Sequence, residues 1–167
     1  QLILDFSMSY TFAILPMFVL MGAFVHRSGL SEDLYDASNA WLGHLRGGLS
    51  MATVAASAGF GAVCGSSVAT AATMGRVAFP PMTRYGYDRG LAAGTIVAGG
   101  TLGILIPPSM SLVVYGFLTQ QDIGRLFIAG LAPGLLTVGL YFGVIAFVTR
   151  LRPELGPPGP STSWRDR

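Results

Sequence analysis

The sequence predicts an all-α integral membrane protein, in which transmembrane helices accompany a re-entrant helical hairpin and a proline-broken helix. Three observations lead to this prediction. Of the 167 residues, 51% are hydrophobic and only 11% are charged, and the mean hydropathy is +0.59. A soluble domain normally carries about twice that charged fraction. The 23 glycines also fit membrane helices, where small residues permit close backbone approach.

The first two predicted helices differ in polarity. A spanning helix needs roughly 20 mostly apolar residues, and residues 11–27 are apolar enough to form one. Residues 31–45 are too polar to span the membrane. We expect Ser31 to be the N-cap of this second helix, with Glu32 and Asp33 in its first turn. Its amphipathic pattern, together with Trp41, places it in the membrane interface.

Residues 48–80 are apolar but interrupted near their middle. No charged residue occurs between Leu49 and Gly75, yet small and polar residues gather around Gly65–Ser67. The two runs on either side are each short for a full crossing. We therefore predict a re-entrant hairpin that enters the membrane, turns at Gly65–Ser67 and leaves on the same side. Pro80–Pro81 should end its second arm.

Two further membrane helices follow the hairpin. Residues 90–119 are apolar, but Pro107–Pro108 should break them inside the bilayer. Residues 125–150 form a long hydrophobic helix. Together, residues 1–153 make one membrane domain. Residues 154–167 are rich in Pro, Gly and Ser and are expected to form a disordered cytoplasmic loop.

The distribution of arginines supports the hairpin independently of its glycines. If the hairpin is re-entrant, six arginines fall on one side of the membrane and only Arg125 falls on the other. The positive-inside rule makes the arginine-rich side cytoplasmic. A single crossing by residues 49–79 would instead divide the arginines between both sides. The six are Arg27, Arg46, Arg84, Arg89, Arg150 and Arg152.

The break at Pro107–Pro108 predicts a cation site. Irregular backbone at membrane depth is tolerated only where it is buried in protein or lines a cavity. The two prolines lack the N–H groups that would bond the carbonyls of Gly103 and Ile104, and such carbonyls are good sodium ligands. Nearby hydroxyls should complete the sodium site, and we expect them to be those of Ser66, Thr101 and Ser109.

The hairpin tip predicts an anion site. Ser66 and Ser67 stand where the second arm begins, so they can cap it and leave N–H donors facing an anion. We expect substrate to bind Gly65, Ser66, Ser67 and Thr70. A structural interpretation competes with this one, because the serines can act as helix caps alone and most of the glycines as packing contacts. Two consecutive lost donors at Pro107–Pro108 are harder to explain as a simple kink.

Other classes of function fit the residues less well. A serine nucleophile at the tip would need a base, and the only histidines, His26 and His44, lie outside the hairpin. We therefore expect no enzyme activity and no cofactor. No Cys, His or carboxylate cluster predicts a metal other than sodium, and no basic face predicts nucleic-acid binding. A passive channel, or a membrane scaffold without transport activity of its own, remains an alternative.

Six motifs occur in order through residues 11–153. They are PMFVLMGAFVHRSGL (16–30), GHLRGGL (43–49), CGSSVAT (64–70), MTRYGY (82–87), GILIPPS (103–109) and LFIAGLAPG (126–134). With these motifs in register, the sequence resembles the large membrane (permease) subunit of tripartite ATP-independent periplasmic (TRAP) transporters. One departure is Cys64, where a serine is expected.

The resemblance implies a sodium-driven secondary transporter in the bacterial inner membrane that imports small organic anions such as carboxylates. It also implies two protein partners, a periplasmic binding protein that delivers the substrate and a small membrane subunit. The fold that it implies has two inverted repeats, each with a re-entrant hairpin and a broken helix. This sequence holds one of each, so it resembles the first-repeat half. Transport is then expected of the complete subunit.

Overall fold

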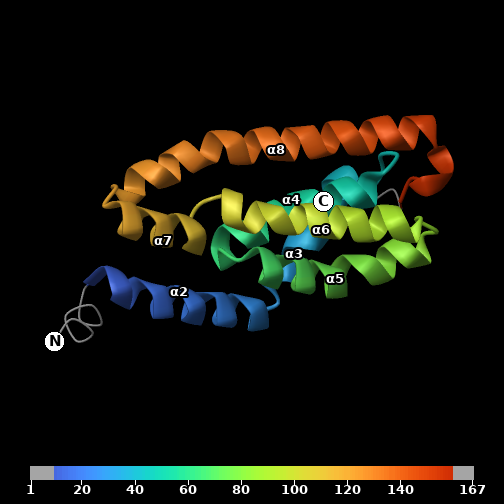
Figure 1. Cartoon of the computed structure of the whole chain (residues 1–167). Coiled ribbons are helices and arrows are strands. Elements are labelled where there is room, and N and C mark those ends of the chain that lie inside the picture. The colour runs from blue at the N-terminus through green and yellow to red at the C-terminus, as the bar shows by residue number, and fades with distance from the viewer. Residues whose placement is uncertain (1–9, 160–167) are drawn as a thin grey trace.

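The computed structural model of the protein describes residues 10–159, which fold into helices joined by short turns (Figure 1). The elements are α2 (Tyr10–Arg27), α3 (Leu30–Leu42), α4 (Gly48–Cys64), α5 (Ser67–Arg84), α6 (Arg89–Leu105), α7 (Met110–Thr119), α8 (Ile123–Leu151) and the short 3₁₀ helix η1 (Pro153–Leu155). The predicted all-α class is therefore confirmed for the described residues.

Helix α4 is the centre of the packing. It contacts α2, α3, α5, α6 and α8. Its side chains are buried almost all round, including Leu49, Val54 and Phe60, as expected for a helix that is apolar on every face. Helix α8 is different, because it lies on the outside and exposes large apolar side chains such as Leu135 and Phe147.

Two stretches of the described residues are long and apolar enough to cross a membrane. They are Arg89–Thr119, which comprises α6 and α7, and Ile123–Leu151, which is α8. Helix α4 is apolar but shorter. These lengths agree with the predicted broken helix at 90–119 and the predicted helix at 125–150. Both predicted interruptions occur, one after Cys64 and one after Leu105.

The amphipathic helix begins one residue earlier than predicted, and Ser31 is not its N-cap. The cap residue of α3 is Gly29, which has a left-handed backbone (φ 80°). The Ser31 hydroxyl instead donates to the Glu32 carboxylate at 2.8 Å. The helix ends at Leu42 rather than at residue 45, because Leu45 N–H turns back to the Leu42 carbonyl. Trp41 is exposed, as an interfacial helix requires.

The prediction that Pro80–Pro81 end the second arm is wrong. Helix α5 continues through both prolines to Arg84. The prolines remove two donors, but the φ of proline is compatible with a helix. The helix closes only after them, since Tyr85 N–H bonds the Pro81 carbonyl at 2.9 Å and Tyr87 N–H bonds the Met82 carbonyl at 3.0 Å.

The first part of the predicted disordered loop is ordered. Residues 153–159 pack back against the turns at the ends of other helices. The Leu155 carbonyl accepts from Asp88 N–H, the Gly156 carbonyl accepts from Gly47 N–H, and Gly159 N–H donates to the Gly43 carbonyl, each at 3.0 Å. Composition alone could not reveal these contacts. Residues 160–167 lie outside the described part of the chain.

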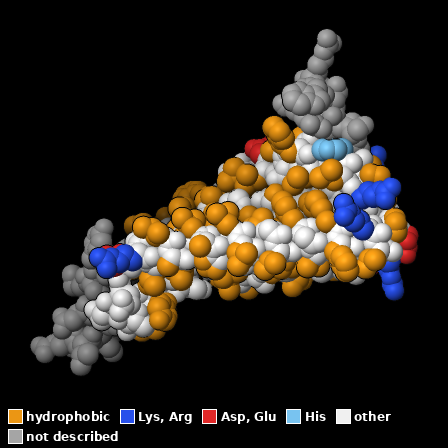
Figure 2. Space-filling view, turned by 90° about the horizontal axis from the view of Figure 1, so that it is seen from above, with side chains coloured by type: hydrophobic (Ala, Val, Ile, Leu, Met, Phe, Trp, Pro, Cys, Tyr) orange, Lys and Arg blue, Asp and Glu red, His pale blue; other side chains and the backbone are white. Residues whose placement is uncertain are grey.

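Most of the arginines on one face gather at one end of the molecule. In Figure 2 a smaller group of basic and acidic side chains lies at the opposite end, and an acidic side chain and a histidine lie at the upper edge between the two ends. The first end is where α4 and α6 begin and α5 and α8 end (Figure 1). Helix α2 ends only partway along α8, so Arg27 stands apart from the arginines predicted to share its side.

Candidate functional site

The turn between α4 and α5 is built by one glycine and one serine. Gly65 adopts a left-handed backbone (φ 65°) and bonds the Gly61 carbonyl at 2.7 Å, which closes α4. Ser66 is extended, and its hydroxyl accepts from Ala69 N–H at 3.4 Å as the N-cap of α5. The Thr70 hydroxyl donates to the Ser66 carbonyl at 2.7 Å. The predicted cap is therefore confirmed for Ser66, whereas Ser67 is the first residue of α5.

The break between α6 and α7 has a similar construction. Ile106 closes α6, and Pro107–Pro108 follow without N–H groups, so no backbone donor from these positions reaches Gly103 or Ile104. Ser109 is fully buried, and its hydroxyl accepts from Leu112 N–H at 3.3 Å as the N-cap of α7. This capping role was not part of the sequence prediction, which assigned Ser109 to sodium.

The two breaks meet in space. Met110 N–H, in the first turn of α7, donates to the Gly65 carbonyl at 3.3 Å. Gly103 approaches the tip so closely that a Cβ atom there would lie 2.8 Å from both the Ser66 carbonyl oxygen and Thr70 Oγ1. The C-terminal ends of α4 and α6 and the N-terminal ends of α5 and α7 therefore converge on one region.

An open pocket of about 560 Å³ lies beside this junction. Ser66 and Ser67 line it from the tip, and Ile104 lines it from α6. None of the residues that line it is charged, so its polarity comes from hydroxyls and backbone groups. The remaining lining residues are Gly65, Met110, Ser111, Val114, Tyr115 and Leu118.

Most of the predicted site residues are brought together, with one exception. Gly65, Ser66, Thr70 and Gly103 form the contacts of the junction itself, and the others line its pocket or cap α7. The exception is Thr101, whose hydroxyl donates to the Ala98 carbonyl at 2.7 Å and lies 3.0 Å from the Tyr141 hydroxyl on α8. Its hydroxyl is therefore engaged on the α8 side of the helix.

Sequence reasoning missed one contributor to this junction and assigned the other a packing role without naming its partner. Met110 supplies the only backbone hydrogen bond recorded between the two breaks among the described residues. Gly61 allows α4 to approach α6, because a Cβ atom there would lie 2.8 Å from Gly103 Cα. A signal for the cap was available, because a serine directly before an apolar run is the pattern of an N-cap, but no pattern predicts which carbonyl Met110 N–H reaches. Gly61 and Gly65, four positions apart, fit the packing interpretation of the glycines, but the contact with Gly103 is not predicted by it.

Comparison with known proteins gives a family for this arrangement. The family model described as the DctM component of the tripartite ATP-independent periplasmic transporter matches residues 3–166. The chain belongs to this family. Its members are membrane permeases, in agreement with the apolar helices α6 to α8.

Curated relatives differ in what they are named for. The C4-dicarboxylate TRAP transporter large permease protein DctM of Pseudomonas aeruginosa is 44% identical over 96% of this chain and 37% of its own length. An ectoine/5-hydroxyectoine large permease, UehC of Ruegeria pomeroyi, is 37% identical over 91% of this chain and 35% of its own. The sialic acid TRAP transporter permease SiaT of Haemophilus influenzae is 29% identical over 95% of this chain and 25% of its own length. The chain thus spans about a third of the length of its relatives.

Proposed function

We propose that this chain is the first-repeat half of the large subunit of a sodium-coupled transporter. The complete transporter imports small organic anions across the bacterial inner membrane, and a periplasmic binding protein delivers them. The observation that carries the proposal is the hydrogen bond from Met110 N–H to the Gly65 carbonyl, which joins the two helix breaks. Membrane transporters use discontinuous helices of this kind to hold ions and substrates without formal charges.

The anion is proposed to bind the N-terminal ends of α5 and α7. The first N–H groups of a helix have no partner within the helix, and the helix dipole favours negative charge there. Ser66 and Ser67 line the pocket from α5, and Ser111 lines it from α7. Two relatives named for acids, C4-dicarboxylates and sialic acid, support an organic anion as substrate.

Sodium is proposed to bind the opposite helix ends. Carbonyls at the C-terminal end of α6 carry partial negative charge, and those of Gly103 and Ile104 have prolines, which lack N–H groups, four positions later. The Thr70 hydroxyl oxygen lies beside Gly103, and Ser109 provides a second hydroxyl at the start of α7. Oxygen atoms are the ligands that hard cations prefer. We place the coupling ion between these carbonyls and the Ser66 carbonyl.

The pair α4–α5 is proposed to be re-entrant. In Figure 1 its tip lies partway along α8, and both outer ends lie at the arginine-rich end of the molecule. Cysteines introduced at Arg46 and Arg84 should then be labelled by an impermeant thiol reagent from the same, cytoplasmic side. Labelling from opposite sides would contradict the hairpin. The small membrane subunit and the binding protein are proposed from the family's tripartite, periplasmic description.

The decisive experiment changes one backbone donor. Met110 occupies the first position of α7, where proline is tolerated, and Ser109 before it is already extended (φ −125°, ψ 142°). Met110→Pro should therefore remove the N–H that bonds Gly65 while keeping the helix. Met110→Ala is the matched control, because it removes the same side chain and keeps the N–H.

Uptake is measured with the complete transporter in proteoliposomes, with its binding protein, radiolabelled C4-dicarboxylate or sialic acid, and a sodium gradient. The parent should take up one of these acids only with sodium. Met110→Pro should lose most of that uptake and Met110→Ala should lose little. Uptake that is indifferent to sodium would refute the coupling, and equal uptake by both variants would refute the role of the junction.

A further inference from the structure

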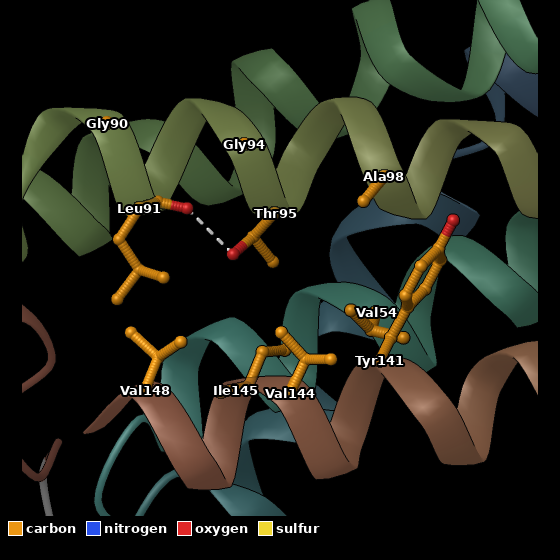
Figure 3. A pocket seen from close by; sticks show the side chains of 10 residues that line it. All are labelled: Val54, Gly90, Leu91, Gly94, Thr95, Ala98, Tyr141, Val144, Ile145 and Val148. Atoms are coloured by element: carbon orange, nitrogen blue, oxygen red, sulfur yellow. Dashed lines mark hydrogen bonds between the residues drawn. The ribbon is translucent and has the colours of Figure 1, made fainter. Parts of the chain in front are cut away.

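A second pocket, of about 190 Å³, lies between α6 and α8, away from the junction of the breaks (Figure 3). Small residues on α6 form one wall and larger side chains on α8 form the other. At Gly94 there is open space, since a Cβ atom would meet nothing within 4 Å. The principal wall residues are Gly90, Gly94, Ala98, Tyr141, Val144 and Val148.

The interior of this α6–α8 pocket offers no unpaired polar side chain to a ligand. The Thr95 hydroxyl donates to the Leu91 carbonyl at 2.7 Å, as drawn in Figure 3, and the Tyr141 hydroxyl is 3.0 Å from Thr101 Oγ1. The rest of the lining is aliphatic or glycine. An apolar cavity of about 150 Å³ can hold a benzene ring, so this pocket can hold a stretch of alkyl chain.

The pocket borders a row of exposed apolar side chains on α8. Val144, which lines it, is 59% exposed, and Leu140 and Phe147 on the same helix are as exposed. In a membrane permease such a surface faces either lipid or another part of the transporter. An alkyl chain could therefore enter the pocket from the lipid phase without crossing a polar layer.

One end of the pocket is basic. Arg89 directly precedes Gly90, and Arg152 N–H bonds the Val148 carbonyl at 2.9 Å, one helical turn beyond the pocket wall. Arg150 lies in the same last turn of α8. Two acids are nearby in sequence, Asp88 and Glu154, but the Asp88 carboxylate already accepts two backbone N–H groups of α6. Three arginines against two acids leave this end positive.

We propose that the α6–α8 pocket binds an anionic phospholipid, with part of one acyl chain between Gly94 and Val144 and its phosphate at Arg89, Arg150 and Arg152. Charge complementarity selects this occupant, because basic residues next to a membrane helix attract anionic headgroups. The lipid would fill the space left by the glycines of α6 and hold α8 at its present distance. A side chain from the remainder of the transporter is the competing occupant.

The first test fills the pocket. Gly94→Leu should place an alkyl side chain in the space proposed for the lipid, whereas Gly139→Leu adds the same side chain to α8 at a position that is also open but does not line the pocket. The complete transporter is equilibrated with phosphatidylglycerol, purified in detergent and examined by native mass spectrometry. The parent and Gly139→Leu should retain one phospholipid that Gly94→Leu loses. Equal retention by all three overturns the proposal.

The second test addresses the headgroup. Arg89→Gln combined with Arg152→Gln should weaken binding of phosphatidylglycerol about five-fold for each arginine, and should leave binding of phosphatidylcholine unchanged. Arg125→Gln, at the opposite end of α8, is the control and should alter neither. A preference for phosphatidylglycerol that survives in the double variant overturns the assignment of the phosphate to these arginines.

A third measurement does not depend on the folding of Gly94→Leu. Phe147→Trp and Leu135→Trp are made with the native tryptophans replaced by Phe; both sites are exposed on α8, and Phe147 precedes the wall residue Val148 without lining the pocket itself. Phosphatidylglycerol with brominated acyl chains should quench Trp at 147 at a lower mole fraction than brominated phosphatidylcholine does, with no such difference at 135. Equal quenching by both lipids at 147 overturns the proposal and favours a protein side chain as occupant.

Discussion

Gly103→Ala tests directly whether the two helix breaks form one site. The added Cβ would lie 2.8 Å from the Ser66 carbonyl oxygen and from Thr70 Oγ1, so α6 and the tip must separate by about 0.6 Å to reach an ordinary contact of 3.4 Å. The Met110 N–H to Gly65 bond is already 3.3 Å long, and this separation would break it. Overpacking costs roughly 1–3 kcal/mol, offset by about 0.5–1 kcal/mol for replacing a helical glycine.

The two consequences can be measured separately. If the strain destabilises the sodium-bound state by about 1.4 kcal/mol relative to the sodium-free state, the sodium concentration for half-maximal uptake rises about ten-fold. Thermal stability should fall only slightly. Gly143→Ala on α8 is the control, because its Cβ would meet nothing within 4 Å, and it should keep the parental sodium requirement. A parental sodium requirement in Gly103→Ala would refute the reasoning that the junction holds the ion.

Three further predictions follow from the same geometry. Replacing Pro107–Pro108 with two alanines should let α6 re-bond its last carbonyls. Both the thermal stability and the sodium concentration for half-maximal uptake should then rise. A changed stability with an unchanged sodium concentration would mean that the break is only a kink. Ser66→Ala with Ser67→Ala should cost about 1 kcal/mol as a lost cap and should also weaken substrate binding, measured by concentration-dependent uptake. Thr101→Val should lower thermal stability by about 1 kcal/mol through its bond to Tyr141; a sodium-specific defect without loss of stability would restore Thr101 to the ion site.

Local chemistry made much of this fold predictable. Uninterrupted apolar runs predicted the long helices, and the small and polar residues around Gly65 predicted the first interruption. Ser66 was recognisable as a cap because a serine directly before an apolar run is the pattern of a helix N-terminus. These features depend on neighbours within a few positions in the sequence, which is the range over which residue patterns are informative.

The remainder depends on contacts between distant residues. Thr101 was predicted to be a sodium ligand and stands two positions before Gly103, yet its hydroxyl lies 3.0 Å from that of Tyr141, forty positions later. Residues 153–159 have the composition of a disordered segment and are held by backbone bonds to Gly43, Gly47 and Asp88. A backbone bond has no side-chain signature, so neither composition nor periodicity could predict it.

The two proline pairs show how context decides the effect of one motif. Pro80–Pro81 and Pro107–Pro108 each remove two consecutive donors, yet α5 continues and α6 ends. After the first pair, the following N–H groups bond back to the prolines' own turn, and Tyr85 reaches the Pro81 carbonyl. After the second pair comes Ser109, whose hydroxyl caps a new helix. The next donor, Met110 N–H, then bonds Gly65 rather than the preceding turn. The residue after the prolines, and the carbonyl that the next N–H group reaches, therefore distinguish the helix that continues from the helix that ends.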